Sequence, residues 1–170
     1  MLKQPVINTL TFSRTADSLS GSILPENFVR LRDFLAENTG RVDYVLSGGM
    51  DNYGKPILNV VVRGMITLYC QRCLNKMVHP LDIESGLTLA GSNDELARYD
   101  EDSCVDAILA SEALDVHALI EDEIILGLPL SPRHPDISCS MLDKQQATQD
   151  QDNKPHPFAA LKSLKRSRQP

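Results

Sequence analysis

The stretch that decides the fold is residues 58–70, LNVVVRGMITLYC, which form the longest alternating run in the chain. Every second residue of a β-strand shares one face of the strand. One face here would carry Leu58, Val60, Val62, Gly64, Ile66, Leu68 and Cys70. The other face is mixed, so the pattern predicts a long strand that buries one side.

Two neighbouring runs predict partners for this strand. Residues 42–46 alternate in the same way, and residues 51–54, DNYG, have the composition of a turn, which together indicate a β-hairpin. A further alternating run restarts after Pro80 and carries Leu81, Ile83, Leu87 and Leu89. Residues 70–76 then lie in the connection between two strands that we expect to pair antiparallel.

Helical patterns flank these strands on both sides in the sequence. Residues 25–38 begin at a proline and carry Phe28, Leu31 and Leu35 at helical spacing. In residues 115–127, Asp115 can cap a helix with an apolar stripe, and Gly127 and Pro129 end it. We therefore predict an α+β fold, an antiparallel β-sheet with covering helices, in a single domain over residues 1–139. Residues 140–170 are expected to be a polar linker and a basic, largely mobile tail.

Length and composition predict a soluble protein. The chain has 170 residues, of which 42% are hydrophobic, and it contains no apolar run near the roughly 20 residues that a membrane helix needs. The N-terminus lacks a basic start that leads into an apolar core, so we expect a cytoplasmic protein with reduced thiols. Residues 93–123 hold eleven acids and one base, which excludes a uniformly basic nucleic-acid binder.

The cysteine pair Cys70-x-x-Cys73 is the first candidate site. Two thiolates at this spacing on a hairpin turn can occupy adjacent corners of a zinc tetrahedron. His134 and Cys139 are the best candidates for the other two ligands, provided that the helix after Asp115 returns their segment to the hairpin. A second interpretation stays open, in which the pair is two thiols beside a turn. A redox role is disfavoured, because a strand rather than a helix follows the pair.

Charged and apolar side chains supply further candidate sites, whereas no catalytic motif occurs in the sequence, so we expect a protein that is not an enzyme. Candidate RNA-binding residues are the cations that can meet phosphates: Arg72, Lys76, Lys162, Lys165, Arg166 and Arg168. Candidate partner-binding residues are an acidic set expected on a solvated helix face, Glu121, Asp122 and Glu123, and an apolar set in the tail, Phe158, Leu161 and Leu164.

Three segments taken together resemble the bacterial YceD family, the large ribosomal RNA subunit accumulation proteins. They are residues 70–74 (CQRCL), residues 121–134 (EDEIILGLPLSPRH) running on to Cys139, and residues 154–165 (KPHPFAALKSLK). Their order and spacing match over nearly the whole chain. The positions that carry the resemblance are the Cys70–Cys73 pair, the Glu-Asp-Glu helix and the Pro-Phe-Ala-x-Leu tail.

The resemblance implies a cytoplasmic, non-catalytic factor needed for the synthesis, processing or accumulation of 23S ribosomal RNA. We expect an adaptor whose partners are ribosomal RNA or large-subunit precursors and basic ribosomal proteins, with neither a membrane nor a small-molecule substrate involved. No cofactor is required by this interpretation, and zinc is the one candidate. The alternative is a protein–protein interaction module that affects ribosomal RNA indirectly.

Overall fold

The alternating run of residues 58–70 forms most of β5 (Pro56–Tyr69), the central strand of the sheet in this computed structural model. The structure describes residues 4–101, 105–135 and 139. The chain divides into two units, Met1–His134 and Pro135–Pro170, and all the elements below belong to the first. The buried face of β5 is the predicted one, with Leu58, Val60 and Val62 fully buried.

β5 has an antiparallel neighbour on each side, as predicted. β4 (Val42–Met50) pairs with its first half and β6 (Lys76–Ala90) with nearly its full length, so that Val62 lies between Tyr44 and Ile83. β6 starts at Lys76 and runs through Pro80, earlier than the sequence pattern indicates. A proline is tolerated there because β7 (Ala107–Leu109) pairs only with Thr88–Ala90, which leaves this part of β6 at the sheet edge among the described strands.

Shorter strands complete a mixed, mostly antiparallel sheet. β2 (Ser18–Ile23) lies outside β4, β3 (Leu35–Glu37) pairs with the far end of β5, and β7 runs parallel to β6. A separate ribbon joins β1 (Val6–Ile7) to β8 (Leu114–Asp115). Together with the helices below, this confirms the predicted α+β class.

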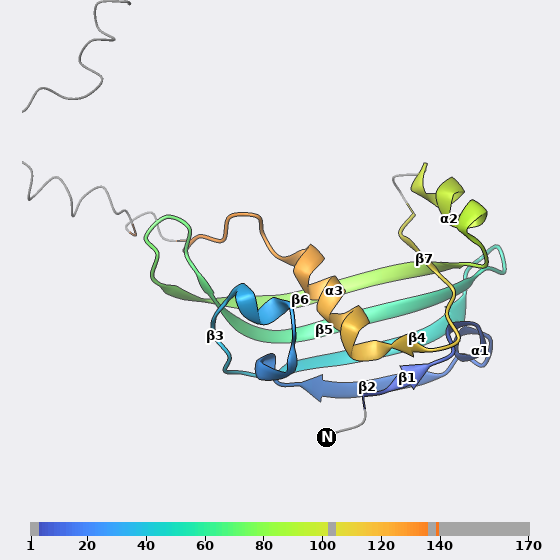
Figure 1. Ribbon diagram of the computed structural model, residues 1–170, viewed down its shortest axis with the longest axis horizontal. Helices are drawn as coiled ribbons and strands as arrows, with labels where there is room; N and C mark the ends of the chain where they lie inside the picture. Colours follow the sequence, from blue (N-terminus) through green and yellow to red (C-terminus); the bar gives the residue numbers. More distant parts are fainter. Residues whose placement is uncertain (1–3, 102–104, 136–138, 140–170) are drawn as a thin grey trace, which may run out of the picture. The chain divides into compact units, whose positions relative to one another are not determined.

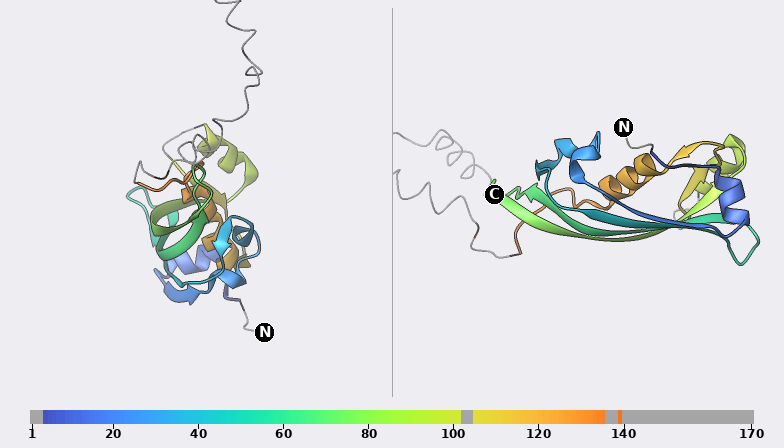
Figure 2. Two further views of the ribbon diagram at one scale, coloured as in Figure 1. Left: turned by 90° about the vertical axis from the view of Figure 1, so that its left-hand side faces the viewer. Right: turned by 90° about the horizontal axis from the view of Figure 1, so that it is seen from below.

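The predicted second helix is α3 (Val116–Gly127), which lies across one face of the sheet (Figure 1). The Asp115 carboxylate caps it by accepting the backbone N–H groups of His117 and Ala118. Ile120 and Ile124 are fully buried, and α3 shares its face of the sheet with the 3-10 turns described below (Figure 2). Two short helices, α1 (Thr9–Arg14) and α2 (Asn93–Asp100), lie at the end of the sheet opposite the turn between β5 and β6 (Figure 1). None of the described helices is long and apolar enough to cross a membrane.

The prediction of a helix over residues 25–38 is wrong. This region forms two 3-10 turns, η1 (Pro25–Asn27) and η2 (Leu31–Asp33), followed by β3. Its apolar residues Phe28, Leu31 and Leu35 are buried all the same. The backbone N–H groups of Arg30 and Leu31 are donated to the side chain of Glu121 on α3, so they are not available to helical carbonyl groups four residues earlier.

Candidate functional site

The turn between β5 and β6, residues 70–75, is called the cysteine hairpin here. The N–H of Cys70 donates to the carbonyl of Asn75 (2.9 Å) and the N–H of Leu74 donates to the carbonyl of Cys70 (2.8 Å). Leu74 has a left-handed backbone, with φ of 59°, which closes the turn. This compact backbone buries both cysteines.

Backbone N–H groups surround the sulfur of Cys70. Burial raises the pKa of the Cys70 thiol, but hydrogen bonds from the backbone of Cys73, His134 and Arg72 outweigh burial and lower that pKa to about 5. This lowering favours the thiolate form of Cys70. The thiolate is the form of cysteine that binds metals and acts as a nucleophile.

The segment that follows α3 does return to the cysteine hairpin, which is the condition that the sequence left open. The N–H of Gln71 donates to the carbonyl of Pro132 (2.8 Å), and Nη2 of Arg72 donates to the carbonyl of His134 (3.1 Å). These two bonds fix His134 beside the hairpin.

The imidazole of His134 is held by both of its nitrogens. Nδ1 lies 3.5 Å from Sγ of Cys73, and Nε2 lies 3.3 Å from the carbonyl oxygen of Lys76. With the proton on Nε2 donated to Lys76, the lone pair of Nδ1 faces the cysteines. Metal-binding histidines are oriented in this way by a hydrogen bond from the second ring nitrogen.

The structure therefore brings together three of the four predicted metal ligands. The candidate ligand atoms of Cys70, Cys73 and His134 all lie within 4.8 Å of one another. Cys139 belongs to the second unit of the chain, so its role as the fourth ligand stays a prediction. The chemistry of the three is that of a thiolate-imidazole metal centre.

The two predicted RNA-binding cations near the hairpin, Arg72 and Lys76, each contact another residue of the same chain. Arg72 is half-buried and holds His134, while Nζ of Lys76 lies 2.6 Å from a carboxylate oxygen of Glu37. Arg133 is exposed beside His134, and the sequence analysis did not include it among the candidate RNA-binding cations. Its position next to a candidate metal ligand could have indicated it. The predicted cations Lys162, Lys165, Arg166 and Arg168 lie outside the described residues, as do Phe158, Leu161 and Leu164.

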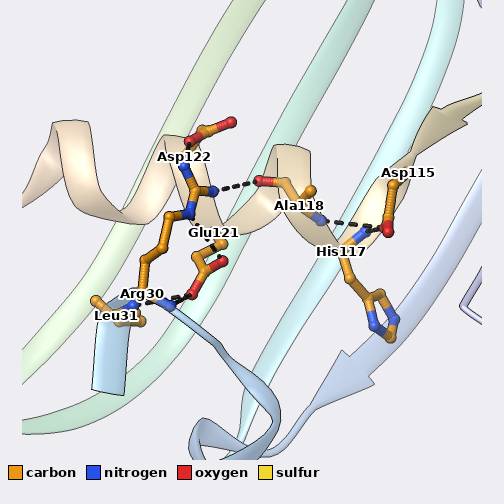
Figure 3. A network of polar contacts seen from close by, with 7 residues as sticks. All are labelled: Arg30, Leu31, Asp115, His117, Ala118, Glu121 and Asp122. Carbon is orange, nitrogen blue, oxygen red and sulfur yellow. Dashed lines mark hydrogen bonds and ion pairs between the residues drawn. The ribbon is translucent and has the colours of Figure 1, made fainter. Parts of the chain in front are cut away.

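The prediction that Glu121, Asp122 and Glu123 lie on a solvated face of α3 is wrong for Glu121 and Glu123. Glu121 is 5% exposed, and its Oε1 accepts the N–H groups of Arg30 (2.7 Å) and Leu31 (2.8 Å), as Figure 3 shows. Glu123 is 8% exposed and accepts the hydroxyl of Ser85 (2.6 Å). Asp122 is half-exposed and pairs with Arg30 (2.6 Å). Glu121 and Glu123 therefore stabilise the fold, because their carboxylates hold backbone and hydroxyl donors in the interior.

Exposed acids lie instead on and just after α2, beyond the far end of β6. Asp94, Asp100 and Glu101 are exposed there. They form the acidic end of the first unit, whereas Arg72, Lys76 and Arg133 form its basic end. The two ends are separated by the length of β6 (Figure 1).

An apolar groove of about 420 Å³ opens between η2, the end of β5 and the residues after α3. The apolar residues that line it include Phe34, Leu68, Ile125, Leu128 and Leu130. Phe34 is 56% exposed, and Leu130 is fully exposed. The groove also includes Gln71 and Pro132, so it adjoins the cysteine hairpin.

Comparison with known proteins identifies relatives of this chain. The sequence model of the family described as large ribosomal RNA subunit accumulation protein YceD matches residues 58–165. The large ribosomal RNA subunit accumulation protein YceD of Haemophilus influenzae is 30% identical over 123 residues, which cover 66% of this chain and 70% of that protein. No solved structure matches the chain.

Proposed function

This chain belongs to the YceD family of large ribosomal RNA subunit accumulation proteins, and from this premise we propose that it is a non-catalytic adaptor in large-subunit biogenesis. In this proposal the basic end contacts ribosomal RNA in a 23S precursor. The acidic end contacts a basic ribosomal protein. The adaptor acts in the cytoplasm, where the large subunit assembles.

The observation that carries the proposal is the separation of charge along β6. Arg72, Lys76 and Arg133 lie where the strand begins, and the acids of α2 follow where it ends. A strand of 15 residues is about 50 Å long at about 3.4 Å per residue. Two partners of opposite charge can therefore bind at once without competing for the same surface.

Arg133 is the cation of the basic end best placed for an RNA phosphate. Its side chain is exposed, and its Nε donates a long hydrogen bond to the hydroxyl of Ser131 (3.3 Å). Lys76 would have to share its charge with Glu37, and Arg72 with the carbonyl of His134. Phosphate contacts of this kind supply affinity without reading the base sequence, which suits an adaptor.

Co-sedimentation with large-subunit precursor particles tests the RNA contact. The test variant reverses Arg133, Lys162, Lys165, Arg166 and Arg168 to Glu, and the control is Arg14→Glu, an exposed cation on α1 at the other end of the strands. At low salt, where charge contacts are strongest, we expect the wild type and the control to sediment with the particles. The test variant should stay at the top of the sucrose gradient.

The acidic end is tested in the same assay by changing Asp94, Asp100 and Glu101 to Lys. We expect this variant to keep its binding to naked 23S ribosomal RNA and to lose its binding to isolated basic ribosomal proteins. Equal RNA binding by the wild type and by the variant whose cations are reversed to Glu would contradict the proposal. Cleavage of precursor RNA by the purified protein alone would contradict its non-catalytic part.

The apolar groove favours a second candidate function, a protein–protein interaction module that affects ribosomal RNA indirectly. Phe34 and Leu130 are large apolar side chains exposed at one concave surface, and such surfaces commonly bind partner proteins. The variant Phe34→Ser tests it, with Val29→Ser, another exposed apolar residue, as the control. Loss of ribosomal RNA accumulation in cells with intact RNA binding in vitro would favour the module over the adaptor.

A further inference from the structure

The spacing of the candidate ligand atoms is that of a tetrahedral metal site. Zinc binds cysteine sulfur at about 2.3 Å and histidine nitrogen at about 2.0–2.1 Å, so neighbouring sulfur and nitrogen ligands lie about 3.6 Å apart. Sγ of Cys73 and Nδ1 of His134 are 3.5 Å apart, and Cys70 adds a third ligand atom within 4.8 Å of both.

The surroundings of the three residues also favour a metal over two thiols beside a turn. Two free thiols would not require a histidine held in a fixed orientation beside them. Here Nε2 of His134 contacts the carbonyl of Lys76, and Arg72 donates to the carbonyl of His134. Backbone N–H groups of Cys73 and Arg72 also hydrogen-bond to the sulfur of Cys70. Such outer contacts orient metal ligands and fix the tautomer of histidine.

The donor set selects among metals. Magnesium and calcium prefer oxygen ligands, whereas two thiolates and an imidazole suit zinc. The sequence supplies a fourth ligand, a third thiolate, in Cys139, five residues after His134. Five extended residues span up to about 17 Å, so the linking segment is long enough for Cys139 to reach a metal held beside His134.

We propose that Cys70, Cys73 and His134 bind one zinc ion, that Cys139 completes the tetrahedron, and that the ion ties the segment after α3 to the cysteine hairpin. The two hydrogen bonds of Gln71 and Arg72 otherwise make this connection. Because Gln71 of the hairpin and residues 128–130 and 132 line the apolar groove, the ion would also fix the wall of that groove. This inference is independent of the adaptor proposal.

Metal analysis of the protein purified under reducing conditions is the first test. We expect one zinc ion per chain in the wild type and a loss of at least ten-fold in zinc occupancy in Cys70→Ser and Cys73→Ser. Cys104→Ser is the matched control, since it removes a cysteine that the proposal does not use, and it should retain its zinc. Zinc lost equally in all three variants, or absent from the wild type after reconstitution, would overturn the proposal.

Cobalt substitution tests the ligands without relying on loss of the fold. Tetrahedral Co²⁺ bound to thiolates has intense visible absorption together with a sulfur-to-metal charge-transfer band. We expect both bands in the wild type, a stronger charge-transfer band in His134→Cys, and weaker binding in His134→Ala. An unchanged spectrum in His134→Cys would exclude His134 as a ligand.

Chelation of the wild-type protein covers the case in which cysteine variants fail to fold. Removing zinc should lower the melting temperature, and adding one equivalent of zinc should restore it, because a metal that binds only the native state stabilises that state. A metal-free protein whose melting temperature does not respond to zinc would overturn the proposal. Cys139→Ser should weaken zinc binding at least ten-fold, and full affinity in that variant would remove Cys139 from the ligand set.

Discussion

Oε1 of Glu121 on α3 lies 2.8 Å from the backbone nitrogen of Leu31, ninety residues earlier in the chain. The same oxygen accepts the N–H of Arg30 at 2.7 Å, and the other carboxylate oxygen lies 3.3 Å from Nε of Arg30. One buried carboxylate thus accepts the two backbone N–H groups at the start of η2, which have no helical carbonyl as acceptor. This contact joins the irregular segment after η1 to the helix that covers the sheet.

Replacing Glu121 should therefore reduce stability. Glu121→Ala leaves two backbone N–H groups without their acceptor, and we expect a loss of about 3 kcal/mol in the free energy of unfolding. Urea unfolding followed by circular dichroism measures the loss. The control Asp122→Ala removes a half-exposed ion pair with Arg30 and should cost under about 1 kcal/mol. Equal effects of the two substitutions would contradict a structural role for Glu121.

The same carboxylate makes stability depend on pH. Burial raises the pKa of Glu121, but hydrogen bonds from the N–H groups of Leu31 and Arg30 and from the Arg30 side chain outweigh burial and lower it. The native state therefore binds fewer protons here than the unfolded state. The contribution is complete above the unfolded pKa of about 4.3 and disappears as the pH falls through the lowered native pKa.

Urea unfolding of wild type and Glu121→Gln at pH 7 and at pH 3 tests this sign. Gln does not titrate, so the stability advantage of the wild type should shrink in acid. An advantage that grows as the pH falls would show that the native pKa is raised instead.

Gly48 allows α1 to pack against β4. A Cβ atom at this position would lie 2.4 Å from the carbonyl oxygen of Phe12 and 2.7 Å from Cα of Ser13, both of them backbone atoms. Gly48→Ala should therefore destabilise the protein by about 2 kcal/mol, since the helix must shift. In Gly49→Ala the new atom would meet, among the described residues, only Ile57, at 3.8 Å, so stability should change by under about 0.5 kcal/mol. Thermal unfolding of the pair checks the difference.

Removal of the proposed zinc ion should be visible at the N–H of Gln71. This group donates to Pro132 across the cysteine hairpin, so its hydrogen exchange reports on that connection. We expect chelation to speed exchange of peptides that contain Gln71 at least ten-fold. The N–H of Thr9, which donates to Ser111 and is far from the hairpin in the fold, should exchange at an unchanged rate. Uniformly faster exchange would indicate global destabilisation rather than release of the hairpin.

Local sequence patterns predicted the central part of the fold. The alternation of β5 and the cap of α3 at Asp115 depend on neighbouring residues, so the strand face and the helix start could be inferred without any partner. The turn position of Cys70 and Cys73 followed from the two strands that flank it. The resemblance to the YceD family rested on motifs of the same local kind.

Tertiary structure decided what depends on distant residues. Residues 25–38 carry a helical pattern, yet Glu121 takes the N–H groups of Arg30 and Leu31, and the segment forms 3-10 turns. Glu121 and Glu123 look like a solvated face in sequence, but buried donors on other elements pair with them. His134 meets Cys73 because Gln71 and Arg72 hold its segment across sixty residues of chain. A local pattern records the preference of a residue, whereas a hydrogen bond between distant segments exists only after the chain has folded.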